Sequence, residues 1–149
     1  MNAESDLLKL YSGRILALAA DIPHHGRLPA PMASAKRRSP LCGSTVTVDL
    51  IVAGGRVSDY AQDVKACALG QASASVVGSA IIGCTADQIT RARDELSAML
   101  KAGGPVPSAP FAGLEVLLPA RDYKNRHASI LLALEAAAEA MAAATASPV

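Results

Sequence analysis

The sequence predicts an α+β domain in which a small antiparallel sheet is covered on one face by helices. An amphipathic helix comes first, an alternating strand with a Gly-Gly turn follows, and helical patterns fill the second half. Hairpin strands are antiparallel, so the helices that follow must pack on one face as a two-layer sandwich. The length of 149 residues suits a single domain over residues 1–149 with one core.

The first helix is followed by an irregular segment. Apolar residues recur at roughly helical spacing from Leu7 to Asp21, which predicts an amphipathic helix that ends before Pro23. Residues 22–41 hold four prolines and the basic run Lys-Arg-Arg at positions 36–38. We expect an extended loop or an edge strand of the sheet here, with the basic run solvated.

A β-hairpin is predicted next. Thr45–Ala53 alternates between valine or leucine on one side and threonine, aspartate or isoleucine on the other, which is typical of a half-buried strand. Gly54-Gly55 forms a two-residue hairpin turn, because glycine accepts positive φ freely. A second strand from Arg56 to about Lys65 is predicted mainly from this turn, since its own alternation is poor.

The helix after the hairpin is unusual in its small side chains. Residues 68–82 are dominated by alanine, serine, glycine and valine, and small residues repeat every four positions at Gly70, Ala74 and Gly78. Such a face lets another backbone approach closely. Glycine lowers intrinsic helicity, so tertiary packing must stabilise this helix.

Two further helices complete the chain. A capping box over residues 85–88 begins the first, which ends at Gly-Gly-Pro 103–105. A proline-containing loop is expected to about Pro119, and the last helix to run from about Asn125 into an alanine tract. We expect residues 143–149 to be a frayed tail.

Composition and charge exclude several classes of protein. The net charge of +1 provides no strong field for nucleic acid or a membrane surface. No uninterrupted apolar run reaches about 18 residues, and the N-terminus lacks the pattern of a secretory signal. We therefore expect a cytoplasmic location and reduced thiols, because three cysteines without an export signal argue against a disulfide framework.

Two cysteines and one histidine stand out by position. Cys42 precedes the first strand of the hairpin and Cys67 follows the second, at the start of a helix. The two open ends of a hairpin lie side by side, so topology brings these thiols together. The N–H groups of a helix start favour a thiolate. His127 lies at the start of the last helix.

These features resemble the U-type iron–sulfur cluster assembly scaffolds, which are IscU-, SufU- and NifU-like. The likeness rests on Cys42-Gly43, a strand, a glycine turn, Asp59, and then Cys67 opening a helix rich in alanine and serine. It covers most of the chain, from the first helix to the last. The helix after Cys67 is closest to the SufU-like branch.

The sequence departs from this family at two positions. The aspartate of the family's Cys-Gly-Asp motif is Ser44 here, and the family's third cysteine is missing from the last helix. One alignment places His127 at that cysteine. A shift by one residue makes Ala128 the lost cysteine and His127 its neighbour, and we expect His127 to face the site in either case. Imidazole can replace thiolate on iron or zinc.

The resemblance implies a scaffold or carrier for a labile [2Fe–2S] cluster, or for its iron and sulfur precursors. Cys42, Cys67 and His127 would be the metal-binding residues. A cysteine desulfurase would supply sulfur, and apoproteins would receive the cluster. One alternative is a zinc-binding sulfur acceptor that partners a desulfurase. Another is a degenerate regulatory or interaction domain without metal.

We expect no enzymatic activity and no nucleic-acid or membrane partner. A Cys/His hydrolase needs an orienting group and an oxyanion hole, and the sequence assigns neither. Cys84 matches no ligand of the family and is expected to be structural. An adjacent pair such as His24 and His25 cannot easily chelate one ion in a strand, because neighbouring side chains point to opposite faces. We expect these two to be solvent-exposed loop histidines.

Overall fold

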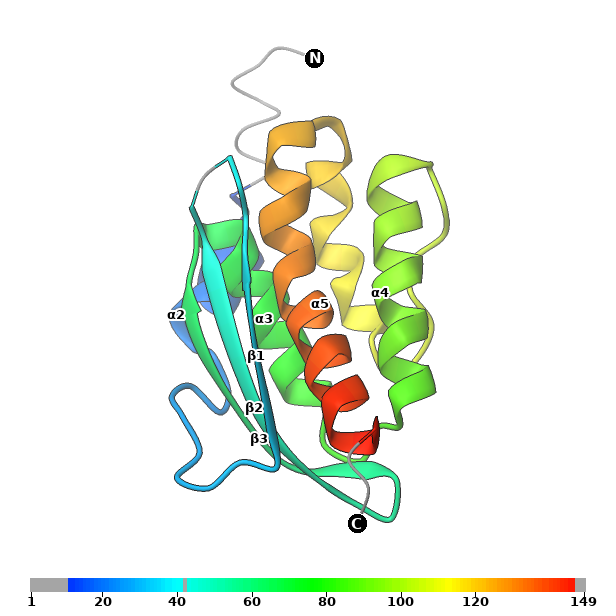
Figure 1. Cartoon of the computed structure of the whole chain (residues 1–149). Coiled ribbons are helices and arrows are strands. Elements are labelled where there is room, and N and C mark those ends of the chain that lie inside the picture. Colours follow the sequence, from blue (N-terminus) through cyan, green and yellow to red (C-terminus); the bar gives the residue numbers. More distant parts are fainter. Residues whose placement is uncertain (1–10, 42, 147–149) are drawn as a thin grey trace.

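The structure is a computed structural model that describes residues 11–41 and 43–146. Its sheet has three antiparallel strands in the order β1-β2-β3, namely β1 (Ala33–Arg38), β2 (Thr45–Ala53) and β3 (Arg56–Lys65). The helical elements are α2 (Gly13–Ala20), α3 (Ala68–Ala80), α4 (Ala86–Lys101), the 3₁₀ helix η1 (Ala112–Asp122) and α5 (Lys124–Ala146). Figure 1 shows α3, α5 and α4 on one side of the sheet, which confirms the α+β fold.

The hairpin has the predicted bounds. The alternating apolar residues Val46, Val48 and Leu50 are fully buried under the helices, as a half-buried strand requires. Gly54 and Gly55 have φ values of 59° and 77°, in the left-handed region that a two-residue hairpin turn needs. Alternation therefore predicted β2, and the Gly-Gly turn predicted β3.

The first helix and the segment after it differ from the prediction in part. The helix expected from Leu7 is wrong over residues 11–12, and residues 7–10 lie outside the described residues. Ser12 instead caps α2, because its Oγ accepts a hydrogen bond from the N–H of Ile15. The edge strand expected as one possibility within residues 22–41 is confirmed as β1.

Two expectations for the C-terminal half are corrected. Residues 112–122 form η1 rather than a loop, with Pro119 inside it. Proline lacks an N–H group and disfavours an α-helix interior, and this segment is a 3₁₀ helix instead. Helix α5 continues through Ala146, so residues 143–146 are helical rather than frayed, and residues 147–149 lie outside the described part of the chain.

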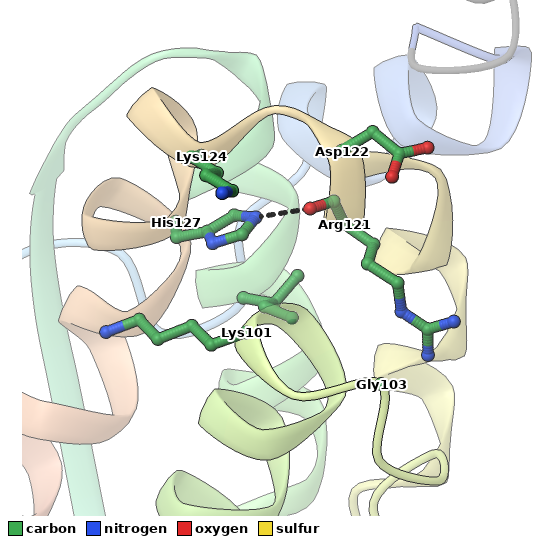
Figure 2. Close-up of a pocket in the computed structure, with 7 residues that line it drawn as sticks. Lys101, Gly103, Arg121, Asp122, Lys124 and His127 are labelled. Carbon is green, nitrogen blue, oxygen red and sulfur yellow. Dashed lines mark hydrogen bonds between the residues drawn. The ribbon is translucent and has the colours of Figure 1, made fainter.

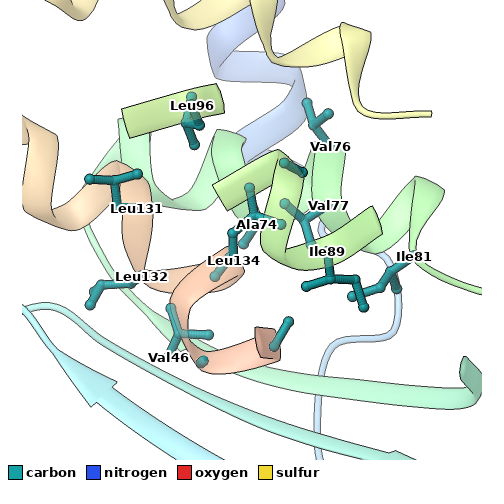
Figure 3. Close-up of a cluster of buried hydrophobic side chains, with 14 of the residues drawn as sticks. Val46, Ala74, Val76, Val77, Ile81, Ile89, Leu96, Leu131, Leu132 and Leu134 are labelled. Atoms are coloured by element: carbon teal, nitrogen blue, oxygen red, sulfur yellow. The ribbon is translucent and has the colours of Figure 1, made fainter. Parts of the chain in front are cut away.

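Helix α5 lies at the centre of the fold. It packs against β1 and β2 on one side and against α3 and α4 on the others. Figure 3 shows Leu132 beside Val46 of β2, with Leu131 on the side of Leu96 of α4. By length and composition α5 could span a membrane, but 61% of its most apolar window is buried inside the protein, as in a core helix.

The proline-rich segment before β1 crosses the outer face of the sheet. It begins at the free edge of β3, where Gln62 donates its N–H to the carbonyl of His24 and accepts from the N–H of Gly26. It ends at the opposite edge, where the N–H of Met32 bonds to the carbonyl of Leu50. Between these two points it covers the middle strand.

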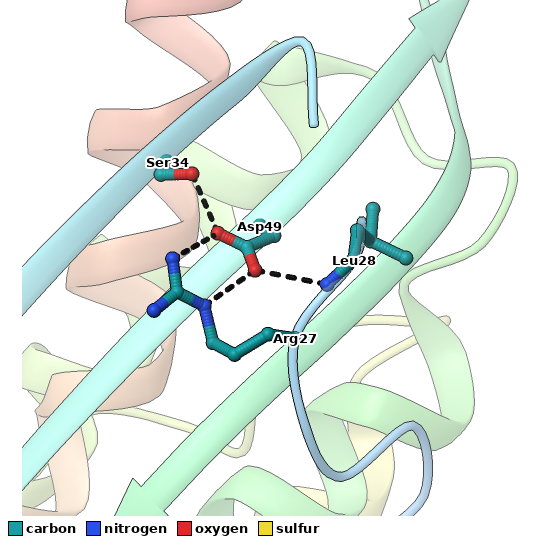
Figure 4. A network of polar contacts seen from close by, with 4 residues as sticks. All are labelled: Arg27, Leu28, Ser34 and Asp49. Carbon is teal, nitrogen blue, oxygen red and sulfur yellow. Dashed lines mark hydrogen bonds and ion pairs between the residues drawn. The ribbon is translucent and has the colours of Figure 1, made fainter. Parts of the chain in front are cut away.

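Asp49 of β2 fastens this crossing segment (Figure 4). Its carboxylate accepts from Arg27 Nε at 2.6 Å and from the N–H of Leu28 at 3.0 Å, and it also accepts from the hydroxyl of Ser34. Burial alone would raise the pKa of Asp49, but these hydrogen bonds outweigh it and hold the pKa below its ordinary value. A residue on the polar side of β2 is thus buried and paired.

The small-residue face predicted on α3 makes close contacts at both ends. A Cβ atom added to Gly70 would lie 2.7 Å from Ser129 Oγ and 2.9 Å from the Cβ of Ala66. A Cβ added to Gly78 would lie 2.6 Å from the side-chain nitrogen of Gln62. Glycine at these positions lets α5 and the sheet approach α3, which confirms the prediction.

Gly70→Ala should therefore lower the free energy of unfolding by about 1 kcal/mol. Overpacking costs about 1–3 kcal/mol, and the higher helix propensity of alanine returns up to about 1 kcal/mol. Gly13→Ala is the matched control, because an added Cβ there meets nothing within 4 Å. It should leave stability unchanged or raised in urea denaturation. Equal changes in the two variants would contradict the close contact at Gly70.

Candidate functional site

Cys67 occupies the N-cap position of α3, two residues after β3 ends. Its backbone is extended, with φ −66° and ψ 169°, and its side chain makes no capping hydrogen bond. The thiol is half-buried, so it is partly accessible to solvent. Its Sγ lies 3.5 Å from Ser129 Oγ of α5. The predicted place of Cys67, where a strand ends and a helix begins, is confirmed.

Two buried serines join this cysteine to the start of β2. Ser129 is 1% exposed, and its Oγ donates to Ser44 Oγ at 3.1 Å. Ser44 precedes β2, and the pairing of Thr45 with Lys65 places that strand start beside the end of β3. Cys67, Ser129 and Ser44 therefore bring α3, α5 and the open end of the hairpin to one point, as the topology predicted for the hairpin ends.

The other predicted thiolate ligand, Cys42, lies outside the described residues. Its neighbour Gly43 has a φ of 70°, a left-handed conformation that favours glycine. A Cβ on Gly43 would lie 3.7 Å from the guanidinium of Arg38 at the end of β1. The backbone next to Cys42 thus turns sharply between β1 and β2.

His127 makes contacts different from those expected of a ligand. The ring is 4% exposed, and its Nε2 lies 3.0 Å from the carbonyl oxygens of both Ala120 and Arg121. Carbonyl oxygens only accept, so Nε2 carries the proton. The ring lines a pocket of about 520 Å³, and Figure 2 shows it with the other lining residues. This cavity is lined by Leu100, Lys101, Gly103, Arg121, Asp122, Lys124 and His127.

The hydroxyl of Ser129, rather than the ring of His127, is the α5 group that reaches Cys67. His127 and Ser129 are separated by two positions, which is about 200° around an α-helix. Their side chains therefore leave α5 on different sides. Within residues 11–41 and 43–146, no three His, Cys, Asp or Glu side chains are placed to hold a metal ion. His127 as a ligand stays a prediction.

Sequence reasoning missed Ser129 because the family resemblance places the third cysteine at position 127 or 128. The signal that could have found Ser129 is the small-residue face of α3. Gly70 lies on the first turn of α3 after Cys67, and the small-residue face that includes it was predicted to meet another backbone. The residue of α5 that fills this gap is Ser129.

The remaining cysteine, Cys84, and the two loop histidines are placed as expected. Cys84 is buried, and its Sγ donates to the carbonyl of Ala80 at 3.2 Å. Burial raises the pKa of the Cys84 thiol, although nearby Arg56 opposes this shift. His24 and His25 are exposed, and the ring of His24 meets Tyr60 edge-on.

The fold and this site define a small α+β protein with a half-exposed cysteine at a helix start. It is similar to a nitrogen-fixing NifU-like protein (N-terminal) from Brucella abortus, with TM-score 0.93, 45% identity, and 96% of this chain and 99% of that chain covered. With this identity over nearly all of both chains, the chain belongs to the NifU-like family of U-type iron–sulfur cluster assembly scaffolds.

Two more distant structures share the fold. One is a putative iron–sulfur cluster assembly scaffold protein for the SUF system from thermophilic Fervidobacterium islandicum, with TM-score 0.79, 21% identity, and 90% of this chain and 98% of that chain covered. The other is a hypothetical protein with TM-score 0.78, 24% identity, and 91% and 98% covered. No protein-family model and no curated protein matches the sequence.

Proposed function

We propose that this chain is an iron–sulfur cluster assembly scaffold or carrier. It takes up iron and sulfur, or a labile [2Fe–2S] cluster, and passes this cargo to apoproteins. The observation that carries the proposal is the 45% identity to a NifU-like protein over almost the whole chain. The position of Cys67 supports it, because a half-buried thiol at a helix start is reachable by a partner.

Cys67 and Cys42 are the proposed thiolate ligands and sulfur acceptors. Sulfur arrives from a cysteine desulfurase, which carries it as a persulfide. The thiolate of this chain attacks the outer persulfide sulfur, a new S–S bond forms, and the donor cysteine leaves as its thiolate. A scaffold with this role works in a compartment that keeps thiols reduced, which supports a cytoplasmic location.

We further propose that the protein is not an enzyme. A Cys–His pair would need the imidazole within hydrogen-bond reach of the thiol. Here Cys67 contacts Ser129, whereas the Nε2 of His127 bonds to backbone carbonyls on another side of α5. These contacts support a thiol that binds and transfers cargo rather than one activated by His127.

A zinc-binding sulfur acceptor is the second candidate, and one observation favours it. The polar groups at Cys67 in the described part of the site are the hydroxyls of Ser129 and, through it, Ser44. A tetrahedral zinc ion bound by few ligands of this chain would keep a position for a thiol from a partner, and zinc prefers sulfur and nitrogen ligands. Zinc would then present Cys67 to the desulfurase rather than build a cluster.

Metal and sulfide content after anaerobic purification and reconstitution separates these functions. The protein would be isolated without air, incubated with iron and sulfide, desalted, and examined by elemental analysis and visible absorption. Near-stoichiometric iron and sulfide, with charge-transfer bands lost in Cys42→Ala, are expected of a scaffold. Zinc alone would favour the sulfur acceptor, and protein free of any metal would favour a degenerate interaction domain.

A further inference from the structure

The hydroxyl of Ser129 lies in a space that the fold keeps open for it. Gly70 is on the first turn of α3, three residues after Cys67, and any side chain there would begin 2.7 Å from Ser129 Oγ. Glycine inside a helix is destabilising relative to alanine. Glycine at position 70 makes room for a polar group, since Ser129 Oγ contacts both the thiol of Cys67 and the hydroxyl of Ser44.

A serine hydroxyl can adapt to both forms of its cysteine neighbour. It carries one proton to donate and two lone pairs to accept with. While Ser129 donates to Ser44, the S–H of Cys67 donates to Ser129 Oγ, which accounts for the contacts of 3.1 Å and 3.5 Å. A metal-bound or persulfide sulfur has no proton, and the same contact then needs Ser129 to turn its proton toward Cys67.

We propose that Ser129 is a positioning residue for Cys67, holding its sulfur in place and donating a hydrogen bond to that sulfur when it carries metal or a persulfide. This inference rests on the proposed function, in which Cys67 binds metal or sulfur. Hydrogen bonds to ligating sulfur tune the stability and potential of a metal centre, and losing such a supporting group costs about 10–100-fold in metal affinity. Ser129 thus acts through Cys67 and not as a ligand itself.

Cobalt(II) is the probe, because its bonds to thiolate give charge-transfer absorption. Ser129→Ala should shift this band and weaken Co²⁺ binding by about tenfold or more. Ser73→Ala is the matched control: it truncates another fully buried serine, whose Oγ donates to the carbonyl of Ile130 at 2.7 Å, away from Cys67. Its band and affinity should stay those of the unmodified protein. Identical behaviour of the two variants would overturn the inference.

A metal-free measurement separates this inference from the proposed function. The alkylation rate of Cys67 by iodoacetamide, resolved by peptide mass spectrometry at a single pH, should fall several-fold in Ser129→Ala and not in Ser73→Ala. If the unmodified protein binds no cobalt, the proposed function fails, yet this slowing would still support Ser129. Gly70→Ala, which displaces the hydroxyl without removing it, should slow alkylation too. Unchanged rates in both variants would refute the role of Ser129.

Discussion

Cys67→Ala is expected to abolish metal loading, whereas Cys84→Ala should keep it. Cys67 is half-buried at the start of α3 beside Ser129 and the open end of the hairpin, so its thiol can meet an incoming ion. Cys84 is buried, and its thiol bonds to the carbonyl of Ala80. Losing a ligand costs more than losing a supporting group, so apparent affinity should fall by more than about 100-fold.

Metal content per protein after iron or zinc loading, with circular dichroism to verify folding, gives the comparison. Equal retention of metal by Cys67→Ala and Cys84→Ala would place the site elsewhere. The same assay applied to His127→Gln tests whether His127 is a metal ligand. Loss of metal in that variant would show that the ring, bound in this structure to two backbone carbonyls, is recruited on loading.

Asp49→Ala should be the most destabilising single change on the outer face of the sheet, at about 2–3 kcal/mol. The reason lies in the N–H of half-buried Leu28, which is left without its charged acceptor. The hydroxyl of Ser34 is exposed and can bond to water instead. Arg27 adds little, because its side chain is 55% exposed and can return to water. Asp59→Ala, at an exposed position of β3, is the control and should change unfolding in urea by less than about 0.5 kcal/mol.

The cost of Asp49→Ala should also depend on pH. Hydrogen bonds hold the pKa of Asp49 below its ordinary value of about 4 in the folded protein. A carboxyl with a lowered folded pKa adds stability that is fully present above the unfolded pKa and is lost as pH falls through the folded one. The gap between the unmodified protein and Asp49→Ala should therefore narrow below about pH 4. A constant gap down to acid unfolding would mean that the charge of Asp49 contributes nothing.

Much of the fold could be predicted because local signals agreed with one another. Thr45–Ala53 alternates and a Gly-Gly turn follows, so the next strand, β3, pairs antiparallel with β2. The capping box at Thr85 and Gln88 is present with both of its hydrogen bonds, since it depends on residues within one turn. Such features need no knowledge of the rest of the molecule.

The parts that could not be predicted depend on distant contacts. Asp49 occupies a polar position in the alternation of β2, and nothing in the sequence says that a segment some twenty residues earlier crosses over it. The candidate site shows the same limit. Motif comparison led to His127, but the rotation of α5 that turns Ser129 toward Cys67 is set by packing against α3 at Gly70.

The central place of α5 also bears on the order of events during synthesis. Cys67 and Ser44 leave the ribosome long before Ser129, and the strands and α3 must wait for α5 to cover them. Until that helix emerges, the nascent chain has the Cys67 thiol without Ser129 and a sheet without the helix that covers it. The contact between Cys67 and Ser129 therefore forms only once the last helix has packed against α3 and the sheet.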